Sequence, residues 1–467
     1  MTDTPARPLA VVVLAAGKGT RMKSDLPKIL HPVLGRTVLG WVLAAVEPLA
    51  AERVVVVTGH GAEQVEASLP ASAMTARQVT QRGSGDAVGA ALPALADFDG
   101  DVLVVNGDGA LFTTETMHAV VDGHRTWASS ATALAIRGDV ALPYGRIIRG
   151  EDGRIDRIVE AADATPEELA VDELNAGVYC FDAEVLRGAV PRLSDDNANG
   201  ELYITDLVAI AAGDGGRTLG VVAGDADELI GINTRADLAH VEDIARRRIL
   251  DALMLSGVSI SMPHTVMVEP TASVAPDAVL LPGTMLRGTT RIEGGATVGP
   301  DSDLTDTLVE TGAVVERSVT REARIGRDVQ VGPFAFLRPG AELQAQSKAG
   351  AFVEIKNSVV GERSKVPHLS YIGDATIGTD TNIGAGNITA NYRPELGRGK
   401  QRTTIGSHVH TGSDTVLVAP LTLGDGAWTG AGSTVVQDVP AGALAIARAR
   451  QTNIEGYTAR VLEGSAG

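Results

Sequence analysis

Short apolar runs alternate with amphipathic stretches along the first 235 or so residues. This alternation is typical of βαβ units, so it predicts an α/β domain with a mainly parallel sheet covered by helices on both faces. Ligands of such sheets bind at the carboxyl ends of the strands. The strand-like runs are Leu9–Leu14, Arg53–Val57, Val102–Val105 and Thr132–Ile136, and the helical patterns include Val38–Ala50 and Ala62–Leu69.

Residues 237–256 carry a single helical pattern, with apolar residues at spacings of three and four. Thr234 can cap the start of this helix, and Gly257 ends it. We therefore predict a linker helix over 237–257 between two domains, which cover residues 1–236 and 258–467.

After residue 265 the apolar residues recur every six positions. A period of six predicts a parallel β-helix in which three units form one triangular coil and the periodic residue points inward. Interruptions near 306–318 and near 393–403 predict two extruded loops, and the small polar tail from Glu455 is expected to be disordered. The predicted inward residues are Val268, Val274, Leu280, Leu286, Ile292, Val298 and Leu304, then Val319, Ile325, Val331, Leu337 and Leu343, then Ile405, Thr411, Leu417, Leu423, Thr429 and Val435.

Composition narrows the class of protein. The chain has 467 residues, enough for two or three cores, and its net charge of −18 argues against binding of nucleic acid through a basic face. Cys180 is the single cysteine, so an internal disulfide is excluded and a reducing compartment is expected. Neither a signal peptide nor an apolar run of about 18 residues is evident. We expect a cytoplasmic protein without stable membrane insertion.

A glycine-rich turn follows the first apolar run. Leu14-Ala15-Ala16-Gly17-Lys18-Gly19-Thr20-Arg21-Met22 leads to Leu26-Pro27-Lys28, so a strand runs into a turn and then two cations. Backbone N–H groups in such a turn can hold phosphate, and Arg21 and Lys28 can neutralise a triphosphate. The turn fits neither a Walker A loop nor a dinucleotide fingerprint.

This motif resembles the entry motif of the sugar-1-phosphate nucleotidyltransferases, a Rossmann-like group. With the hexapeptide half included, the chain resembles, from about Leu9 to Gln451, the bifunctional enzymes that join an N-acetylglucosamine-1-phosphate uridyltransferase to a glucosamine-1-phosphate N-acetyltransferase. In this family the β-helix is left-handed. Further matching segments are Gln78 to Gly85, Asn106-Gly107-Asp108, Tyr144 to Ile147, Ile158 to Glu160, Asn175 to Gly177, Asn199 to Asp206 and Gly231-Ile232-Asn233.

The resemblance implies that the first domain transfers UMP from UTP to N-acetylglucosamine-1-phosphate. Arg21 and Lys28 would be catalytic, and Asp108 and Asn233 would hold Mg²⁺, which prefers oxygen ligands. Gly109-Ala110-Leu111 replaces the usual x-Pro-Leu after Asp108, which we expect to lower efficiency at most. The implied substrate-binding residues are Leu14, Ala15, Ala16, Gly17, Gln78, Gly83, Ser84, Gly145, Glu160, Asn175 and Asn233.

In the second domain, Lys365 to Asp374 resembles the acetyltransferase motif, with His368 as the base. Histidine suits this role because its reference pKa lies near neutrality. The family assembles this site between neighbouring prisms, so a homotrimer is implied. The implied sugar contacts are Arg338, Lys356, Tyr371 and Asn382, and the implied acetyl-CoA contacts are Ala385, Asn391, Tyr392, Ser413, Ala431 and Arg448.

Departures from the family pattern gather in this half: Pro367, Arg393-Pro394, Ala447 and Arg450. They leave open a uridyltransferase whose prism only trimerises. Two further alternatives are an enzyme for another nucleotide or hexose, against which Gln78 and Asn175 argue, and a non-catalytic assembly subunit. His408 and His410 lack an evident third ligand, so a surface pair is favoured over a metal site. By resemblance, the product UDP-N-acetylglucosamine feeds bacterial cell-wall (peptidoglycan) synthesis.

Overall fold

The computed structural model describes residues 7–397 and 399–464, with side chains up to Leu462. The chain divides between Arg246 and Arg247 into two compact units, which are described separately below.

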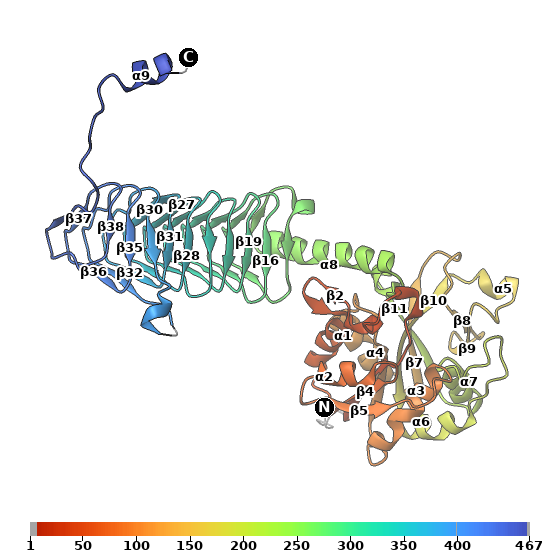
Figure 1. The fold of residues 1–467 in the computed structure, drawn as a ribbon. Coiled ribbons are helices and arrows are strands. Elements are labelled where there is room, and N and C mark those ends of the chain that lie inside the picture. The colour runs from red at the N-terminus through yellow and green to blue at the C-terminus, as the bar shows by residue number, and fades with distance from the viewer. Residues whose placement is uncertain (1–6, 398, 465–467) are drawn as a thin grey trace, which may run out of the picture. The chain divides into compact units, whose positions relative to one another are not determined.

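The first unit is built on a mainly parallel sheet (Figure 1). Its strands follow the order β11-β7-β10-β6-β1-β4-β5, and β10 is antiparallel to both of its neighbours in this order. The four predicted strands are confirmed as β1, β4, β6 and β7. The bounds are β1 Leu9–Ala15, β4 Arg53–Thr58, β5 Met74–Arg77, β6 Asp101–Asn106, β7 Ala131–Arg137, β10 Glu173–Asp182 and β11 Thr218–Ala223, with β8 Arg146–Arg149 and β9 Ile155–Val159 paired beside β10.

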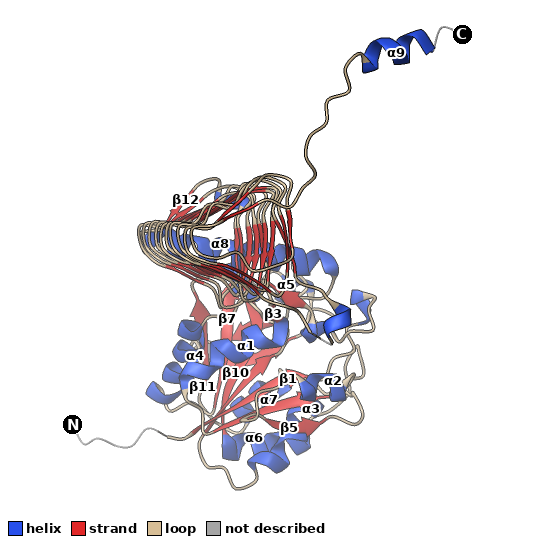
Figure 2. Ribbon diagram, turned by 60° about the vertical axis from the view of Figure 1, so that its left-hand side comes forward, coloured by secondary structure: helices blue, strands red, loops and turns tan. Residues whose placement is uncertain are grey.

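Helices cover both faces of this sheet, as predicted (Figure 2). In β1 every second residue enters one core and the residues between enter the other, which explains why the strand is a continuous apolar run. A short hairpin of β2 (Pro32–Val33) and β3 (Arg36–Thr37) precedes α1, and α5 (Pro166–Leu169) is a single turn. One face is covered by α1 Val38–Val46, α2 Ala62–Ala67 and α4 Thr114–Thr126, the other by α3 Ser84–Ala91, α6 Ala183–Ala189 and α7 Asp206–Gly213.

The predicted long helix is confirmed as α8, Arg235–Leu255. Thr234 caps it as expected: its hydroxyl accepts from the Asp237 N–H at 3.2 Å, and the Asp237 carboxylate accepts from the Thr234 N–H at 2.8 Å. The two compact units meet inside this helix, and the assignment of functions to 1–236 and 258–467 stays a prediction.

The second unit consists of short parallel strands stacked in three sheets. Figure 2 shows the coils lying one behind another. The first sheet contains β12 Ser259–Ile260, β15 Val279–Leu280, β18 Thr297–Val298, β21 Val314–Val315, β24 Gln330–Val331, β27 Lys348–Ala351 and β30 Lys365–His368. The second contains β13 Met267–Val268, β16 Met285–Arg287, β19 Asp303–Thr305, β22 Val319–Arg321, β25 Phe336–Leu337, β28 Glu354–Lys356, β31 Tyr371–Gly373, β33 Ile388–Ala390, β35 Val416–Val418 and β38 Thr434–Val435. The third contains β14 Ser273–Val274, β17 Arg291–Ile292, β20 Leu308–Val309, β23 Arg324–Ile325, β26 Glu342–Leu343, β29 Val359–Val360, β32 Ala375–Ile377, β34 Thr403–Ile405 and β36 Leu421–Leu423, while β37 Trp428–Thr429 pairs with β39 Leu444–Ala445.

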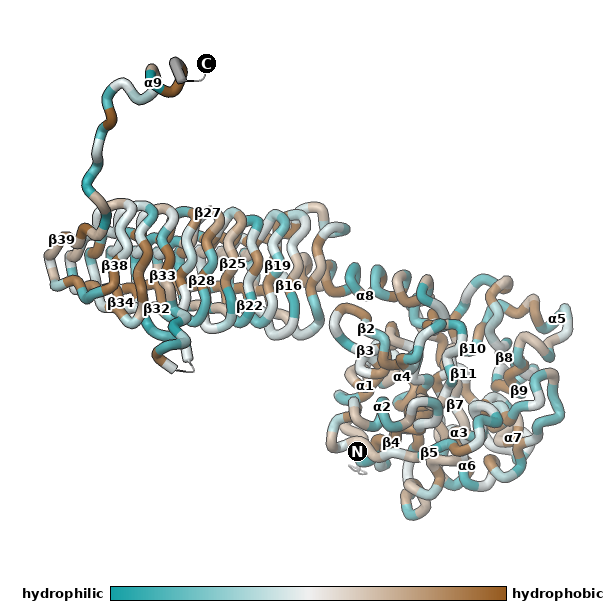
Figure 3. Tube along the Cα trace, in the orientation of Figure 1, coloured by the Kyte–Doolittle hydropathy of each residue, from teal (hydrophilic) through white to brown (hydrophobic). Residues whose placement is uncertain are grey.

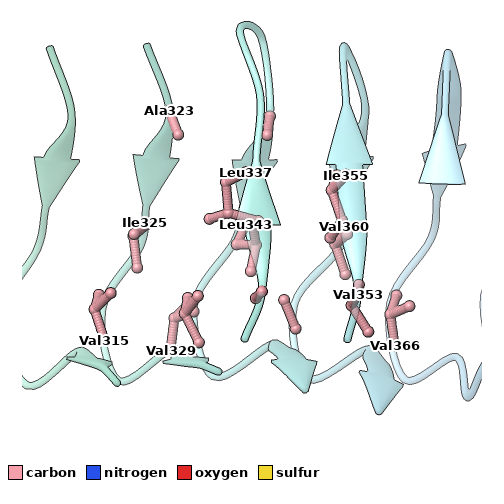
Figure 4. Close-up of a cluster of buried hydrophobic side chains, with 14 of the residues drawn as sticks. Val315, Ala323, Ile325, Val329, Leu337, Leu343, Val353, Ile355, Val360 and Val366 are labelled. Atoms are coloured by element: carbon pink, nitrogen blue, oxygen red, sulfur yellow. The ribbon is translucent and has the colours of Figure 1, made fainter. Parts of the chain in front are cut away.

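Periodic apolar side chains fill the interior of this unit (Figure 4). Leu280, Val298 and Val315 lie in register on consecutive coils and are fully buried. Hydrophobic and hydrophilic residues accordingly alternate along each coil in Figure 3. The prediction of a hexapeptide parallel β-helix is confirmed, and the stacked sheets agree with its left-handed form.

The prediction was wrong at two points between residues 306 and 320. This segment is not an extruded loop, because β20 and β21 continue the coils there. Val319 is 38% exposed, and Thr320 is the residue that points inward. The inward residues Leu304, Val309, Val315, Thr320 and Ile325 are five, six, five and five positions apart, so each spacing of five shifts the phase by one. A Thr307–Thr320 hydroxyl contact of 2.8 Å supplies Thr320 with a polar partner.

The second predicted loop is confirmed. The predicted disorder of the tail is wrong for residues 457–464, which form a helix. Residues 393–397 and 399–402 leave the coil through the 3-10 turn Pro394–Leu396, and Tyr392 pairs with Lys400 across the base of the loop. The tail forms α9 over Tyr457–Gly464, whose Tyr457 and Val461 are one helical turn apart. Among the described residues, no helix is both long and apolar enough to cross a membrane.

Acid is expected to destabilise the first unit through His124. This side chain is 1% exposed, and burial lowers its pKa to about 4 although the Asp101 carboxylate nearby opposes the shift. Because the unfolded pKa is about 6.5, stability is complete above that pH and is lost as the pH falls toward 4. Between pH 7.5 and 5 the loss should be about 2 kcal/mol.

Urea unfolding of a W428F background, followed by Trp41 and Trp127 fluorescence, measures this loss. The His124→Gln variant should show a shallower pH dependence by that amount. Equal slopes in the two proteins would contradict the assignment to His124.

Candidate functional site

Four predicted residues meet where β1 and β6 end. Lys28 Nζ lies 2.6 Å from Asp108 Oδ2 and 3.4 Å from Asn233 Oδ1, and Arg21 Nη2 donates to the same Asn233 oxygen at 2.9 Å. Lys28 is largely buried, with 13% of its side chain exposed. Asp108 and Asn233 follow Lys28 by 80 and 205 residues in the sequence, yet both contact its ammonium group.

The glycine-rich turn determines where Lys28 lies. Gly19 has φ +56°, and a Cβ at this position would lie 2.6 Å from the Lys28 Cβ. Only glycine tolerates both the positive φ and the close approach of the Lys28 side chain without strain. The turn can therefore pack directly against the Pro27-Lys28 segment. The strand end is fixed in turn by the Gly107 N–H, which donates to the Leu14 carbonyl at 2.9 Å.

Asn233 is held by the cap of α8. Partial burial alone would raise the pKa of Asp237, but hydrogen bonds from the N–H groups of Asn233 (3.0 Å) and Thr234 (2.8 Å) outweigh burial, and the pKa lies below its usual value. The carboxylate therefore stays charged at neutral pH and fixes the backbone that presents Asn233.

A cavity of about 430 Å³ lies beside this cluster. It contains the predicted residues Leu14, Ala16, Gly17, Gln78, Gly83 and Ser84. Gln78 is 6% exposed, and its amide N donates to the Gly83 carbonyl and to Asp86. Ala15, also predicted, does not line this cavity, because its side chain lies in the core beneath the sheet.

A second cavity of about 210 Å³ contains the predicted Ser84, Asp108, Gly145, Glu160, Asn175 and Asn233. Ser84 and Asn106 line both cavities, so the two adjoin. Asn106 was not among the predicted site residues, although its position before Gly107-Asp108 at the end of β6 was a usable signal.

Burial controls the chemistry of the second cavity. Burial raises the pKa of Glu160, which accepts a hydrogen bond from the Thr205 hydroxyl at 3.1 Å. Asn175 donates to the Tyr179 hydroxyl at 2.7 Å, and burial raises the pKa of Tyr179 as well. The cavity therefore offers hydrogen-bonding groups suited to a polar molecule such as a sugar.

The residues present fit a magnesium ion shared with substrate. The described residues contain no group of three or more His, Cys, Asp or Glu that could hold a metal. Asp108 and Asn233 do present two oxygens to one cation, the Lys28 ammonium. Mg²⁺ is usually held by one or two such oxygens and completed by phosphates and water.

In the β-helix, His368 begins a column of equivalent positions on consecutive coils. Its carbonyl accepts from the Gly386 N–H, and the Ala385 and Ser413 carbonyls accept from Asp414 and Gly432 in the same way. His368, Ala385, Ser413 and Ala431 therefore lie above one another along one edge. His368 itself is exposed at the end of β30.

The predicted sugar-phosphate residues lie on the adjoining face formed by the second sheet. Arg338 Nη1 is 2.7 Å from Glu354 Oε1, and Glu354 pairs in register with Tyr371. Lys356 pairs with Gly373. Asn391 donates to the Tyr371 hydroxyl at 3.3 Å and to the buried Asp374, so it supports this face from within.

Three predicted residues lie apart from this face. Asn382 pairs with Lys365 and His410 on the first sheet, Tyr392 stands 65% exposed under Lys400, and Arg448 is exposed beyond β39.

His408 and His410 do not share a strand face: His408 is in a left-handed turn, and the His410 ring packs 4.8 Å from the Trp428 ring.

Known proteins resemble this chain over nearly its whole length. A profile of the MobA-like NTP transferase domain matches residues 11–196. Proteins named "Bifunctional protein GlmU" are 48% identical in Streptomyces coelicolor, 45% in Corynebacterium glutamicum and 48% in Mycolicibacterium vanbaalenii. Each alignment covers 98% of this chain and 94–96% of the relative.

A solved structure of UDP-glucose pyrophosphorylase complexed with UDP-glucose matches 52% of this chain and 99% of its own, at 15% identity and a TM-score of 0.44. The identity of 45–48% extends over both halves of the chain, and this shows the family. The chain belongs to the GlmU family of bifunctional enzymes.

Proposed function

We propose that the site residues described above carry out the two reactions that this family membership gives the chain. The enzyme acetylates glucosamine-1-phosphate in its C-terminal half. Its N-terminal half then transfers UMP from UTP to N-acetylglucosamine-1-phosphate and releases pyrophosphate. The observation that carries the assignment of the first site is the convergence of Arg21, Lys28, Asp108 and Asn233 beside two adjoining cavities.

In the uridyltransferase site, the 430 Å³ cavity would take the nucleotide and the 210 Å³ cavity the sugar. A phosphate oxygen of the sugar phosphate attacks the α-phosphorus of UTP, and the bond to pyrophosphate breaks. The attacking group is already an anion, so positioning and charge neutralisation suffice. Arg21 and Lys28 supply positive charge, while Gln78 contacts the base and Glu160 and Asn175 contact the sugar.

Asp108 and Asn233 would hold Mg²⁺ through their side-chain oxygens. When bound, Mg²⁺ would neutralise charge on the phosphates. Lys28 can then move its ammonium from Asp108 to the substrate phosphates, because both are anionic partners of similar kind.

In the acetyltransferase site, the amine of glucosamine-1-phosphate attacks the thioester carbon of acetyl-CoA. His368 takes the amine proton, and the carbon–sulfur bond breaks to release the CoA thiol. Arg338 and Lys356 bind the sugar phosphate, and Tyr371 and Asn382 contact the sugar. Acetyl-CoA lies along the column that starts at His368, with Asn391, Tyr392 and Arg448 as further contacts.

The two-reaction assignment is preferred to a uridyltransferase with an inactive prism. The bifunctional name of the relatives applies over 94–96% of their length, which includes the β-helix. Pro367, the main departure, precedes His368 within β30, and the strand keeps its pairing with β27 on either side of it.

A homotrimer and a cytoplasmic location are also proposed. An exposed apolar edge of the β-helix supports the trimer: Phe334 and Phe352 stack with ring centroids 5.2 Å apart, and Leu369 follows on the next coil, 63% exposed. Because Leu369 is next to His368, a neighbouring prism on this edge would complete the acetyltransferase site. The product would serve bacterial cell-wall synthesis.

Two separate assays test the division of labour. Asp108→Asn should lower pyrophosphate release from UTP, Mg²⁺ and N-acetylglucosamine-1-phosphate by about 100-fold or more, because it removes charge from the metal site. His368→Ala should lower thiol release from acetyl-CoA and glucosamine-1-phosphate by a similar factor of about 100 or more. Each variant should keep the other activity. Loss of both activities in either variant would contradict independent sites.

The Gly19 turn gives a test of Lys28 placement. A Gly19→Ala methyl would collide with the Lys28 Cβ at 2.6 Å and strain a φ of +56°, so pyrophosphate release should fall about 10–100-fold. Gly188→Ala is the control, since a Cβ there meets nothing within 4 Å. Equal activity of the two variants would show that the turn does not position Lys28.

The apolar edge gives a test of the trimer. Phe352→Asp should reduce the mass measured by light scattering from three times 48.2 kDa to a single chain, because a carboxylate cannot be buried unpaired. Thiol release should be lost and pyrophosphate release kept. Phe352→Leu, which preserves the apolar surface, should behave as wild type. A monomeric wild type with full thiol release would refute the proposal.

A further inference from the structure

Glu228 is a buried acid that the two reactions leave unused. It lies in the 3-10 turn Ala226–Leu229 that follows β11, and it is 2% exposed. Nevertheless it lines the 210 Å³ cavity together with Asp108 and Asn233. A carboxylate placed so deeply is costly unless hydrogen bonds hold it.

Two hydroxyl groups from another segment hold Glu228. Thr113 Oγ1 and Thr116 Oγ1 each lie 3.0 Å from Glu228 Oε1. Thr113 is the N-cap of α4, and its hydroxyl accepts from the Thr116 N–H at 3.2 Å. The carboxylate therefore binds the first turn of α4, whose N-cap Thr113 lies five residues after Asp108.

The contact joins the two segments that carry the oxygens facing Lys28. One segment runs from Asp108 to Thr116, and the other runs from Glu228 to Asn233. A backbone hydrogen bond also links them, since the Ile232 N–H donates to the Asp108 carbonyl at 3.3 Å. The first segment contains Gly109, a residue with wide conformational freedom, so a tie beyond it limits how far Asp108 can move.

We infer that Glu228 is a positioning residue that sets the separation of Asp108 and Asn233 for a divalent cation. It acts through Thr113 and Thr116 and does not touch the reacting atoms. This inference rests on the proposed metal role of Asp108 and Asn233. Residues that orient metal ligands typically change metal affinity by about 10–100-fold when they are lost.

The test is equilibrium binding of Mn²⁺ to the full-length protein with saturating UDP-N-acetylglucosamine, measured from the EPR signal of free Mn²⁺. Glu228→Ala should weaken Mn²⁺ binding about 10-fold. Glu228→Gln, which keeps an oxygen acceptor, should recover most of it. Thr116→Val should weaken binding too, and the double variant should be no worse than Glu228→Ala alone.

Glu66→Ala is the matched control, because Glu66 also accepts from a threonine hydroxyl (Thr58, 2.9 Å) but on another part of the sheet. It should bind Mn²⁺ as wild type does. Urea unfolding followed by Trp41 and Trp127 fluorescence in the W428F background reports that the first unit of each variant is folded.

Three outcomes would overturn the inference. Unchanged Mn²⁺ affinity in Glu228→Ala would show that Glu228 only stabilises the fold. A raised KM for N-acetylglucosamine-1-phosphate without a change in Mn²⁺ affinity would make it a sugar contact. Additive effects of Glu228→Ala and Thr116→Val would exclude action through that hydroxyl. Absence of Mn²⁺ binding in the wild type would instead contradict the proposed metal site itself.

Discussion

The contact of the Lys28 ammonium with Asp108 and Asn233 is the interaction on which the N-terminal site depends. It brings together the turn after β1, the end of β6 and the start of α8. The turn carries a cation, the strand end carries a carboxylate and the helix start carries a neutral amide, so the ammonium group attracts both of the other groups. Because the lysine is mostly buried, its charge needs these oxygens, and the lysine in turn holds the two oxygens close to one another.

The rest of the unit is arranged to make that contact. β1 and β6 are neighbours and are buried on both faces, so their ends lie at the same edge of the sheet. Gly19 lets the turn approach Lys28, Asp237 fixes the backbone of Asn233, and Glu228 ties the α4 segment to the α8 segment. The site is thus assembled by short polar contacts at the end of a rigid apolar sheet, which is where parallel sheets bind ligands.

Patterns created by burial could be predicted from the sequence. Strand and helix alternation and the period of six both arise because buried positions must be apolar, and these predictions were confirmed for the sheet and for most of the coils. Arg21, Lys28, Asp108 and Asn233 were grouped by the resemblance to a known family and not by pattern alone, since Asn233 follows none of the predicted strands.

Features decided by contacts between distant residues could not be predicted. Thr320 points inward because the Thr307 hydroxyl, one coil away, supplies its hydrogen-bond partner. The sequence pattern alone is equally compatible with Val319 pointing inward. Glu228 ends an acidic run, Asp225 to Glu228, which by composition is typical of a solvated turn. Only the fold shows that Thr113 and Thr116 lie beside it.

Register explains how the β-helix can carry a loop between Asn391 and Thr403 without a break in the stacking of its coils. The chain leaves the coil after Asn391 and returns at Thr403, yet Ile377 still pairs with Ile405, and Ala390 with Val418. The column from His368 through Ala385 and Ser413 to Ala431 is therefore unbroken, with coil spacings of about 4.8 Å that give a path of about 14 Å. The loop changes the surface around Tyr392 without moving His368, because the ladder of backbone hydrogen bonds, and not the loop, sets the position of that residue.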